Sequence, residues 1–181
     1  MTDTTEKLPT FGALHELATD IGARLSAAGE TVCVSESSSG GLISAALLSV
    51  SGASAFYVGG TVLYTNASRR ALLGMRRVDV SGIAPMTPKM AVVFASKTRA
   101  TLGTDWAIAE LGATGPKGTP YGHEAGTAAI AVSGLRERSM LLNTGVNDRQ
   151  ANMWSFAASA LELLGDALDE KSASWRSTQA K

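Results

Sequence analysis

The chain has 181 residues, a length that suits one domain with a full hydrophobic core. Hydrophobic residues make up 45% and charged residues 18%, with Lys and Arg equal in number to Asp and Glu; this excludes a disordered chain and argues against a nucleic-acid partner. The single cysteine, Cys33, excludes an intrachain disulfide framework and favours a reducing compartment. Because the chain shows no signal-peptide pattern and no apolar run of membrane-spanning length, we expect a soluble, cytoplasmic protein without a membrane partner.

The first part of the chain predicts helices that alternate with strands. Apolar residues at helical spacing predict a helix over 10–29, which ends at Gly29. The β-branched run at 31–35 predicts a buried strand, and a short, largely buried helix follows at 41–50. Aromatic and β-branched residues predict a second strand at 56–65.

The remaining elements are marked by capping residues. We expect Asn66 to cap a helix that Gly74 ends. Thr87 and Pro88 mark the start of the next helix, because proline is favoured at the first helical position. The elements that follow are a helix at 88–103, a strand at 105–111, strands at 127–134 and 139–145 joined as an antiparallel hairpin, and a last helix at 148–169.

This order of elements is typical of an α/β fold in which helices cover both faces of a mixed sheet. We expect about five strands in a single domain over residues 10–170, with an N-terminal tail at 1–9 and a frayed C-terminal tail at 171–181. Ligands of such sheets bind beyond the carboxyl ends of the strands. The segments SESSSGG (35–41) and GATGPKG (112–118) both follow strands, so we expect them to form one pocket.

The segment SESSSGG is the strongest candidate for chemistry. A strand, a turn of small residues and a helix N-terminus present free N–H groups, which suit a phosphate or the oxyanion of an acyl-transfer reaction. The alternative is that Ser37, Ser38 and Ser39 merely cap the helix. The segment matches neither the phosphate loop with its lysine nor the G-x-S-x-G turn of hydrolases.

A nucleophilic serine needs a partner that takes its proton. His123, in the second loop, is one candidate, and the alternative is an exposed loop histidine. Tyr64, at the end of the second strand, could place a phenol at the same sheet edge, or be an ordinary strand tyrosine. Glu36 and Glu110 lie near strand ends, as capping or paired carboxylates. No zinc or calcium pattern is present, and we expect neither a metal nor another cofactor.

Four motifs in this order resemble the C-terminal domain family of CinA: ESSSGG, GASAFYVGGTVLYTNASR, GATGP and GT. The resemblance covers residues 10–168. It implies a three-layer α/β/α sandwich with a largely parallel sheet, in a protein that forms homo-oligomers. It also implies hydrolysis of the carboxamide of nicotinamide mononucleotide, or of a related nucleotide, to a carboxylate with release of ammonia, a step in pyridine-nucleotide salvage.

The resemblance also assigns site residues. It implies that Ser37 is the nucleophile and that Tyr64 belongs to the catalytic set. The residues that it implies for substrate binding, together with the neighbours that we add, are Glu36, Ser38, Ser39, Gly40, Gly41, Asn66, Gly112, Thr114, Gly115, Gly126 and Thr127.

The departures from the family pattern define the open question. Arg69 stands where the family has a lysine, and an arginine stays protonated and cannot accept a proton. His123 and Glu124 replace the Lys-Pro pair before the last motif, and the 116–125 loop has no close match to the family. The last helix keeps the Asp-Arg start of the family at Asp148 and Arg149.

Three hypotheses follow from these departures. The first is an amidohydrolase in which Ser37 attacks the carboxamide, N–H groups of residues 38–41 hold the oxyanion, and Tyr64 or His123 handles the proton. The second is a non-catalytic nucleotide-binding homologue that lost its general base when Arg69 replaced the lysine. The third is a structural or interaction protein.

Overall fold

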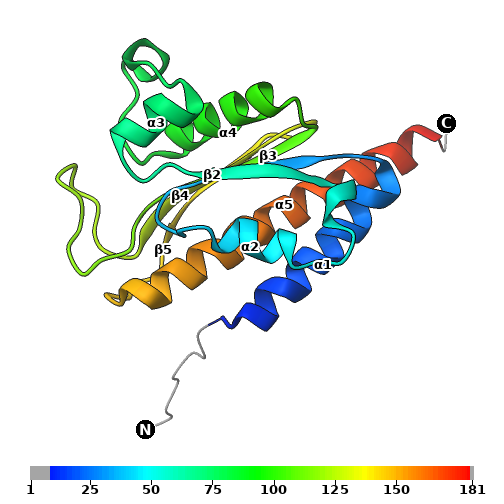
Figure 1. Ribbon diagram of the computed structural model, residues 1–181, viewed down its shortest axis with the longest axis horizontal. Helices are drawn as coiled ribbons and strands as arrows, with labels where there is room; N and C mark the ends of the chain where they lie inside the picture. The colour runs from blue at the N-terminus through cyan, green and yellow to red at the C-terminus, as the bar shows by residue number, and fades with distance from the viewer. Residues whose placement is uncertain (1–8, 180–181) are drawn as a thin grey trace, which may run out of the picture.

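The computed structural model describes residues 9–179, with side chains described as far as Asp169 (Figure 1). The elements are α1 (Phe11–Ala28), β1 (Val32–Glu36), α2 (Leu42–Leu48), the short 3-10 helix η1 (Ala53–Ala55), β2 (Tyr57–Val62), α3 (Asn66–Leu73), the 3-10 helix η2 (Arg77–Val80), α4 (Pro88–Leu102), β3 (Trp106–Ala113), β4 (Thr127–Ser133), β5 (Arg138–Asn143) and α5 (Arg149–Gln179).

The five strands form one mixed sheet in the order β2-β1-β3-β4-β5. Strand β1 pairs in parallel with β2 and β3, whereas β3, β4 and β5 pair antiparallel. The hairpin of β4 and β5 therefore forms as expected. The parallel half brings the carboxyl ends of β1, β2 and β3 to one edge of the sheet, where ligands of α/β proteins bind.

Helices cover both faces of the sheet, which confirms the α/β/α sandwich. Helices α1, α2 and α5 pack on one face, and α3 and α4 lie over the other (Figure 1). Side chains of β1 alternate between these layers: Val32 and Val34 join the core under α1 and α5, whereas Cys33 joins the core under α4. Alanines of β3 and β4 face α4 as well and leave room for that helix to lie close to the sheet.

Most helix ends follow the sequence signals. Gly29, Gly74 and Gly103 adopt the left-handed conformation at the ends of α1, α3 and α4. Thr87 caps α4 by accepting a hydrogen bond from Met90 N–H, directly before Pro88.

The prediction that Asn66 caps α3 is wrong, because the cap is Thr65. Its hydroxyl accepts from Ser68 N–H at 3.2 Å, and Ser68 Oγ accepts from Thr65 N–H at 3.0 Å. This reciprocal pair satisfies two N–H groups, and Asn66 becomes the first helical residue. Strand β2 accordingly ends at Val62, before the predicted end at 65.

The C-terminal helix also differs from its prediction. Helix α5 continues to Gln179, so most of the segment predicted as a frayed tail at 171–181 is helical. The predicted tail at 1–9 lies outside the described residues except for Pro9. Within the described part of the chain, every helix is too short or too polar to cross a membrane.

Candidate active site

Two buried carboxylates hold the serine turn, residues 37–41, in place. Ser35 of β1 pairs with Ala109 of β3, so Glu36 and Glu110 follow one residue later on neighbouring strands. Their exposed fractions are 1% and 0%. Burial of ionised groups is tolerated only where hydrogen bonds replace water, and both carboxylates are surrounded by donors.

Glu110 fixes the first half of the turn. It accepts from Ser37 N–H at 3.0 Å and from Ser39 N–H at 2.9 Å, and the Ser38 hydroxyl donates to it at 2.5 Å. Gly112 makes this approach possible. A Cβ at Gly112 would lie 2.3 Å from Ser38 Oγ and 2.6 Å from the Phe156 ring, so any larger residue would displace the turn.

Glu36 fixes the second half of the turn and caps α2. It accepts from the N–H groups of Gly41, Ile43 and Ser44 at 2.9 to 3.1 Å, and from the Ser44 hydroxyl at 2.6 Å. The hydroxyl of Ser39 lies within hydrogen-bond distance of both Glu36 and Glu110. The alternative in which the serines cap α2 is therefore wrong, because a carboxylate occupies that role.

Ser37 lines a cavity at the carboxyl edge of the sheet. The cavity has a volume of about 560 Å³, within the usual range of small-molecule sites. We call it the serine cavity. Its lining residues are Ser37, Tyr64, Thr65, Asn66, Arg69, Val80, Ile83, Pro85, Met86, Met90, Leu111, Gly112 and Tyr121. The cavity thus brings together the predicted nucleophile, the predicted tyrosine and the arginine that replaces the family's lysine.

Arg69 reaches the serine cavity from α3. Its Nε donates to the Leu63 carbonyl at 3.3 Å, and its guanidinium lies 5.2 Å from the centre of the Phe94 ring. Burial lowers the pKa of Arg69, while Tyr121 and Glu110 oppose that shift. An arginine nevertheless remains protonated in a protein, so Arg69 brings a fixed positive charge to the cavity.

A smaller cavity of about 200 Å³ adjoins the serine cavity, because Tyr64 and Gly112 line both. Ser38, Lys117 and Arg149 line it as well. Arg149, the first residue of α5, donates to the Gly115 carbonyl at 3.1 Å and to the Tyr64 hydroxyl at 3.3 Å. Arg149 thereby connects the start of α5 to the loop after β3 at Gly115 and to the connection after β2 at Tyr64.

His123 does not lie with Ser37. It lines a separate cavity together with Glu124 and Asn147, and its Nδ1 is 3.2 Å from the Thr119 hydroxyl. Its role as a base stays a prediction that the geometry does not support. Tyr121, two residues earlier, is the side chain of this loop that lines the serine cavity.

The remaining predicted residues divide between site and scaffold. Thr114 and Gly115 line the smaller cavity. Gly126 and Thr127 line neither cavity; Thr127 is buried at the start of β4, and Gly126 N–H donates to the Ala113 carbonyl. Gly40 and Gly41 adopt positive φ angles of 69° and 100° inside the turn, which glycine tolerates best.

Sequence reasoning missed several side chains that line the two cavities, among them Lys117, Tyr121 and Arg149. A signal existed for Arg149, since the chain keeps the Asp-Arg start of the family's last helix. Tyr121 and Lys117 lie in the 116–125 loop, whose lack of a family match left no signal for them.

Comparison with known proteins identifies the family. The CinA C-terminal domain model matches residues 14–168. The chain belongs to the CinA C-terminal domain family. It is 32% identical over 142 residues to a CinA-like protein of Salinibacter ruber, covering 78% of this chain and 34% of that protein. It is also 32% identical over 161 residues to a CinA-like protein of Trichormus variabilis, covering 87% and 39%. The chain thus spans little more than a third of the length of these relatives.

Solved structures agree with this assignment. A CinA superfamily protein from Klebsiella pneumoniae superposes with a TM-score of 0.80 at 26% identity, covering 87% of this chain and 98% of that one. The competence/damage inducible protein CihA from Agrobacterium tumefaciens gives a TM-score of 0.79 at 26% identity, covering 91% and 99%. The fold of this CinA-like chain therefore matches these structures over nearly their whole length.

Proposed function

We propose that this CinA-like chain hydrolyses the carboxamide of nicotinamide mononucleotide, or of a related nucleotide, to a carboxylate and ammonia. The observation that carries the proposal is the position of Ser37. It lines a cavity of small-molecule size at the carboxyl edge of the sheet, together with Tyr64 and Arg69, in a chain of this family.

In the proposed reaction, the Ser37 hydroxyl attacks the carboxamide carbon and loses its proton. The carbonyl oxygen becomes an oxyanion, and the tetrahedral intermediate collapses with release of ammonia to leave an ester on Ser37. Water then cleaves this ester, which gives the carboxylate and restores the serine. Tyr64, which lines the same cavity and is held by Arg149, is the residue that we assign to carry the proton.

The contacts of the turn narrow the choice of oxyanion donors. The N–H groups of Ser39 and Gly41 are engaged by Glu110 and Glu36. Those of Ser38 and Gly40 donate to neither carboxylate, and we assign them to the oxyanion. The positive charge of Arg69 also stabilises the oxyanion, although Arg69 cannot accept a proton.

Positive charge beside the smaller cavity suits the phosphate of a nucleotide. Lys117 and Arg149 line this cavity next to the backbone of Gly115 and Gly118. A ligand with its carboxamide at Ser37 would pass Tyr64 and place its phosphate there, since Tyr64 borders both cavities.

The test is ammonia release from nicotinamide mononucleotide, with nicotinamide riboside as the matched substrate that lacks the phosphate. We expect slow turnover of the mononucleotide and slower turnover of the riboside. Thermal unfolding with the mononucleotide should show stabilisation, about 2.7 kcal/mol at a hundredfold excess over Kd. Stabilisation without ammonia release would leave the chain a non-catalytic binding protein, and the absence of both would disprove a nucleotide site.

A further inference from the structure

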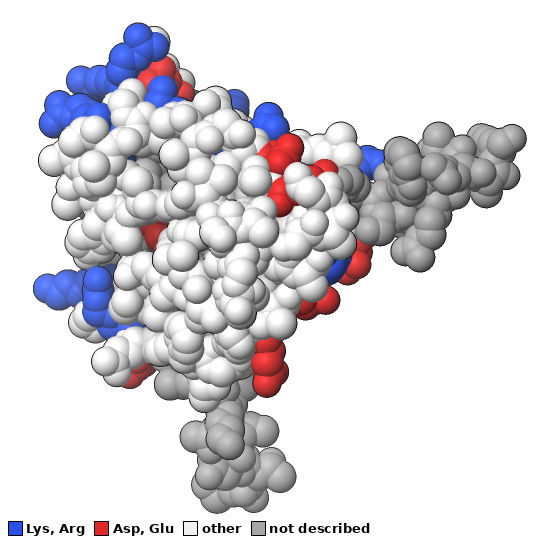
Figure 2. Space-filling view, turned by 45° about the vertical axis from the view of Figure 1, so that its right-hand side comes forward, with Lys and Arg blue, Asp and Glu red and all other residues white. Residues whose placement is uncertain are grey.

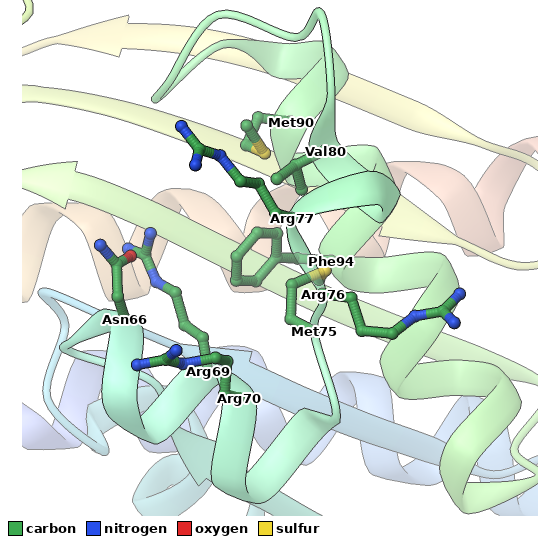
Figure 3. Close-up of a pocket in the computed structure, with 9 residues that line it drawn as sticks. All are labelled: Asn66, Arg69, Arg70, Met75, Arg76, Arg77, Val80, Met90 and Phe94. Carbon is green, nitrogen blue, oxygen red and sulfur yellow. The ribbon is translucent and has the colours of Figure 1, made fainter.

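A further cavity, which shares Asn66, Arg69, Val80 and Met90 with the serine cavity but is not lined by Ser37, is rich in arginine. It has a volume of about 450 Å³ and we call it the arginine cavity. Figure 3 shows its nine lining residues: Asn66, Arg69, Arg70, Met75, Arg76, Arg77, Val80, Met90 and Phe94. Four of the nine are arginines, and the reaction proposed above uses only Arg69.

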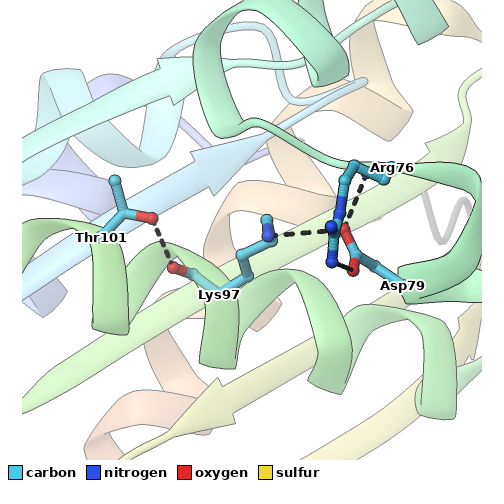
Figure 4. Close-up of polar contacts among 4 residues, drawn as sticks. All are labelled: Arg76, Asp79, Lys97 and Thr101. Atoms are coloured by element: carbon cyan, nitrogen blue, oxygen red, sulfur yellow. Dashed lines mark hydrogen bonds and ion pairs between the residues drawn. The ribbon is translucent and has the colours of Figure 1, made fainter.

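Three of these guanidinium groups lie on the same side of the cavity. Figure 3 shows Arg69 and Arg70 projecting from α3, and Arg77 projecting from η2 toward the same side, with the Asn66 amide beside Arg69. Arg76 points the other way. It forms an ion pair with Asp79 at 3.1 Å, and Lys97 also approaches Asp79 at 3.5 Å (Figure 4).

The three arginines on this side form no salt bridge with a described carboxylate. Among the described side chains, Arg70 and Arg77 form no ion pair, and the contacts of Arg69 are the Leu63 carbonyl and the Phe94 ring. Basic side chains also gather at the upper edge of Figure 2, over the α3–η2 region, in a chain whose formal net charge is zero. Like charges repel, so this cluster destabilises the free protein and is relieved by a bound anion.

We propose that the arginine cavity binds a phosphate or diphosphate group, as a second anion site beside the serine cavity. Guanidinium forks bind phosphate oxygens through paired, charge-assisted hydrogen bonds, and Arg70 and Arg77 have their forks free for this. Met75, Val80, Met90 and Phe94 form the apolar wall of this cavity. The proposal does not rest on amide hydrolysis.

Binding of inorganic pyrophosphate, measured by isothermal titration calorimetry at low salt, tests the proposal. We expect Arg70→Gln and Arg77→Gln each to weaken Kd about tenfold, and the double variant about a hundredfold, because each removes a charge-assisted contact. Both side chains are exposed, so the variants should keep the wild-type melting temperature. Arg70→Lys keeps the positive charge but lacks the guanidinium fork, so its Kd for pyrophosphate should lie between those of the wild type and Arg70→Gln.

The matched control is Arg136→Gln, which removes one exposed arginine in the β4–β5 turn. It should change Kd less than about twofold, because Arg136 does not line the arginine cavity. Absence of pyrophosphate binding by the wild type, or equal losses in Arg136→Gln and Arg77→Gln, would overturn the proposal.

A second titration, with nicotinamide mononucleotide present at saturation, identifies the source of the phosphate. An unchanged pyrophosphate Kd would support a separate anion at this site, and competition would support a phosphate of the same ligand that enters the serine cavity. Both outcomes are compatible with an anion site in the arginine cavity, provided that Arg70→Gln and Arg77→Gln weaken pyrophosphate binding. Neither depends on whether the chain releases ammonia.

Discussion

The serine turn and the loop at 114–126 follow neighbouring strands to the same edge of the sheet, but they are built in opposite ways. In the turn, Ser37, Ser38 and Ser39 are at most 5% exposed, and two carboxylates accept hydrogen bonds from it. In the loop, Tyr121 is 60% exposed. The Thr119 hydroxyl accepts from His123 N–H and also lies 3.2 Å from His123 Nδ1.

This contrast separates the catalytic scaffold from the parts that select a ligand. A turn held by buried carboxylates cannot change one residue without leaving another donor or acceptor unpaired. An exposed loop can change side chains at little cost in stability. The serine turn keeps Glu36, Ser37, Gly40 and Gly41 of the resemblance and departs from it only at Ser38 and Ser39, whereas the 116–125 loop has no close match.

The largest expected effect is that of Ser37→Ala on turnover. Loss of the nucleophile should lower kcat by about a thousandfold or more. Unfolding by urea should change by less than about 1 kcal/mol, because the Ser37 contact to Glu110 uses the backbone N–H. The matched variant is Ser38→Ala, which removes the hydroxyl that donates to Glu110. It should lower the free energy of unfolding more than Ser37→Ala does, and it should lower kcat less than Ser37→Ala does. Wild-type turnover in Ser37→Ala would remove this residue from the mechanism.

The next effect concerns the carboxylate that holds the turn. Glu110→Gln replaces one accepting oxygen by an NH₂ group, which cannot accept the hydrogen bonds that the turn donates to Glu110. We therefore expect a loss of about 3 kcal/mol in the free energy of unfolding. Glu124→Gln makes the same change in the exposed loop and should stay within about 0.5 kcal/mol. Equal losses in urea denaturation would contradict the contrast between the two regions.

A gain of activity is expected from Arg69→Lys. A lysine in this partly buried position can lose its proton and serve as a base, which arginine cannot. The rate of ammonia release should rise by roughly a hundredfold if base catalysis is the missing part. The ratio of the Arg69→Lys rate to the wild-type rate should be larger at pH 9 than at pH 7, because the unprotonated amine is the active form. Fast wild-type turnover that Arg69→Lys lowers would show that this chain uses another base.

The smallest effect separates two neighbouring residues at the start of α3. Thr65→Ala removes the observed cap and should cost about 1 kcal/mol of stability, whereas Asn66→Ala should leave it nearly unchanged. Urea denaturation of the two variants measures both. A larger loss in Asn66→Ala would restore the cap that the sequence pattern predicted.

The accuracy of the sequence predictions follows from how local each signal is. Helical periodicity and the Thr87-Pro88 and Gly74 signals depend on adjacent residues, and the elements that they mark are present. Glu36 was predicted as a capping or paired carboxylate, but the sequence did not decide between Glu36 and the serines as the cap of α2, because Glu36 reaches that helix from the preceding strand, across the turn. Tyr121 and Lys117 were missed because their place in the site depends on how a long loop folds back over the sheet edge, which no local pattern encodes.

Arg69 forms a wall common to the serine cavity and the arginine cavity, and this has an evolutionary consequence. A mutation at position 69 alters both cavities in one step, so selection on one constrains the other. A lysine at this position would remove the guanidinium from both cavities at once.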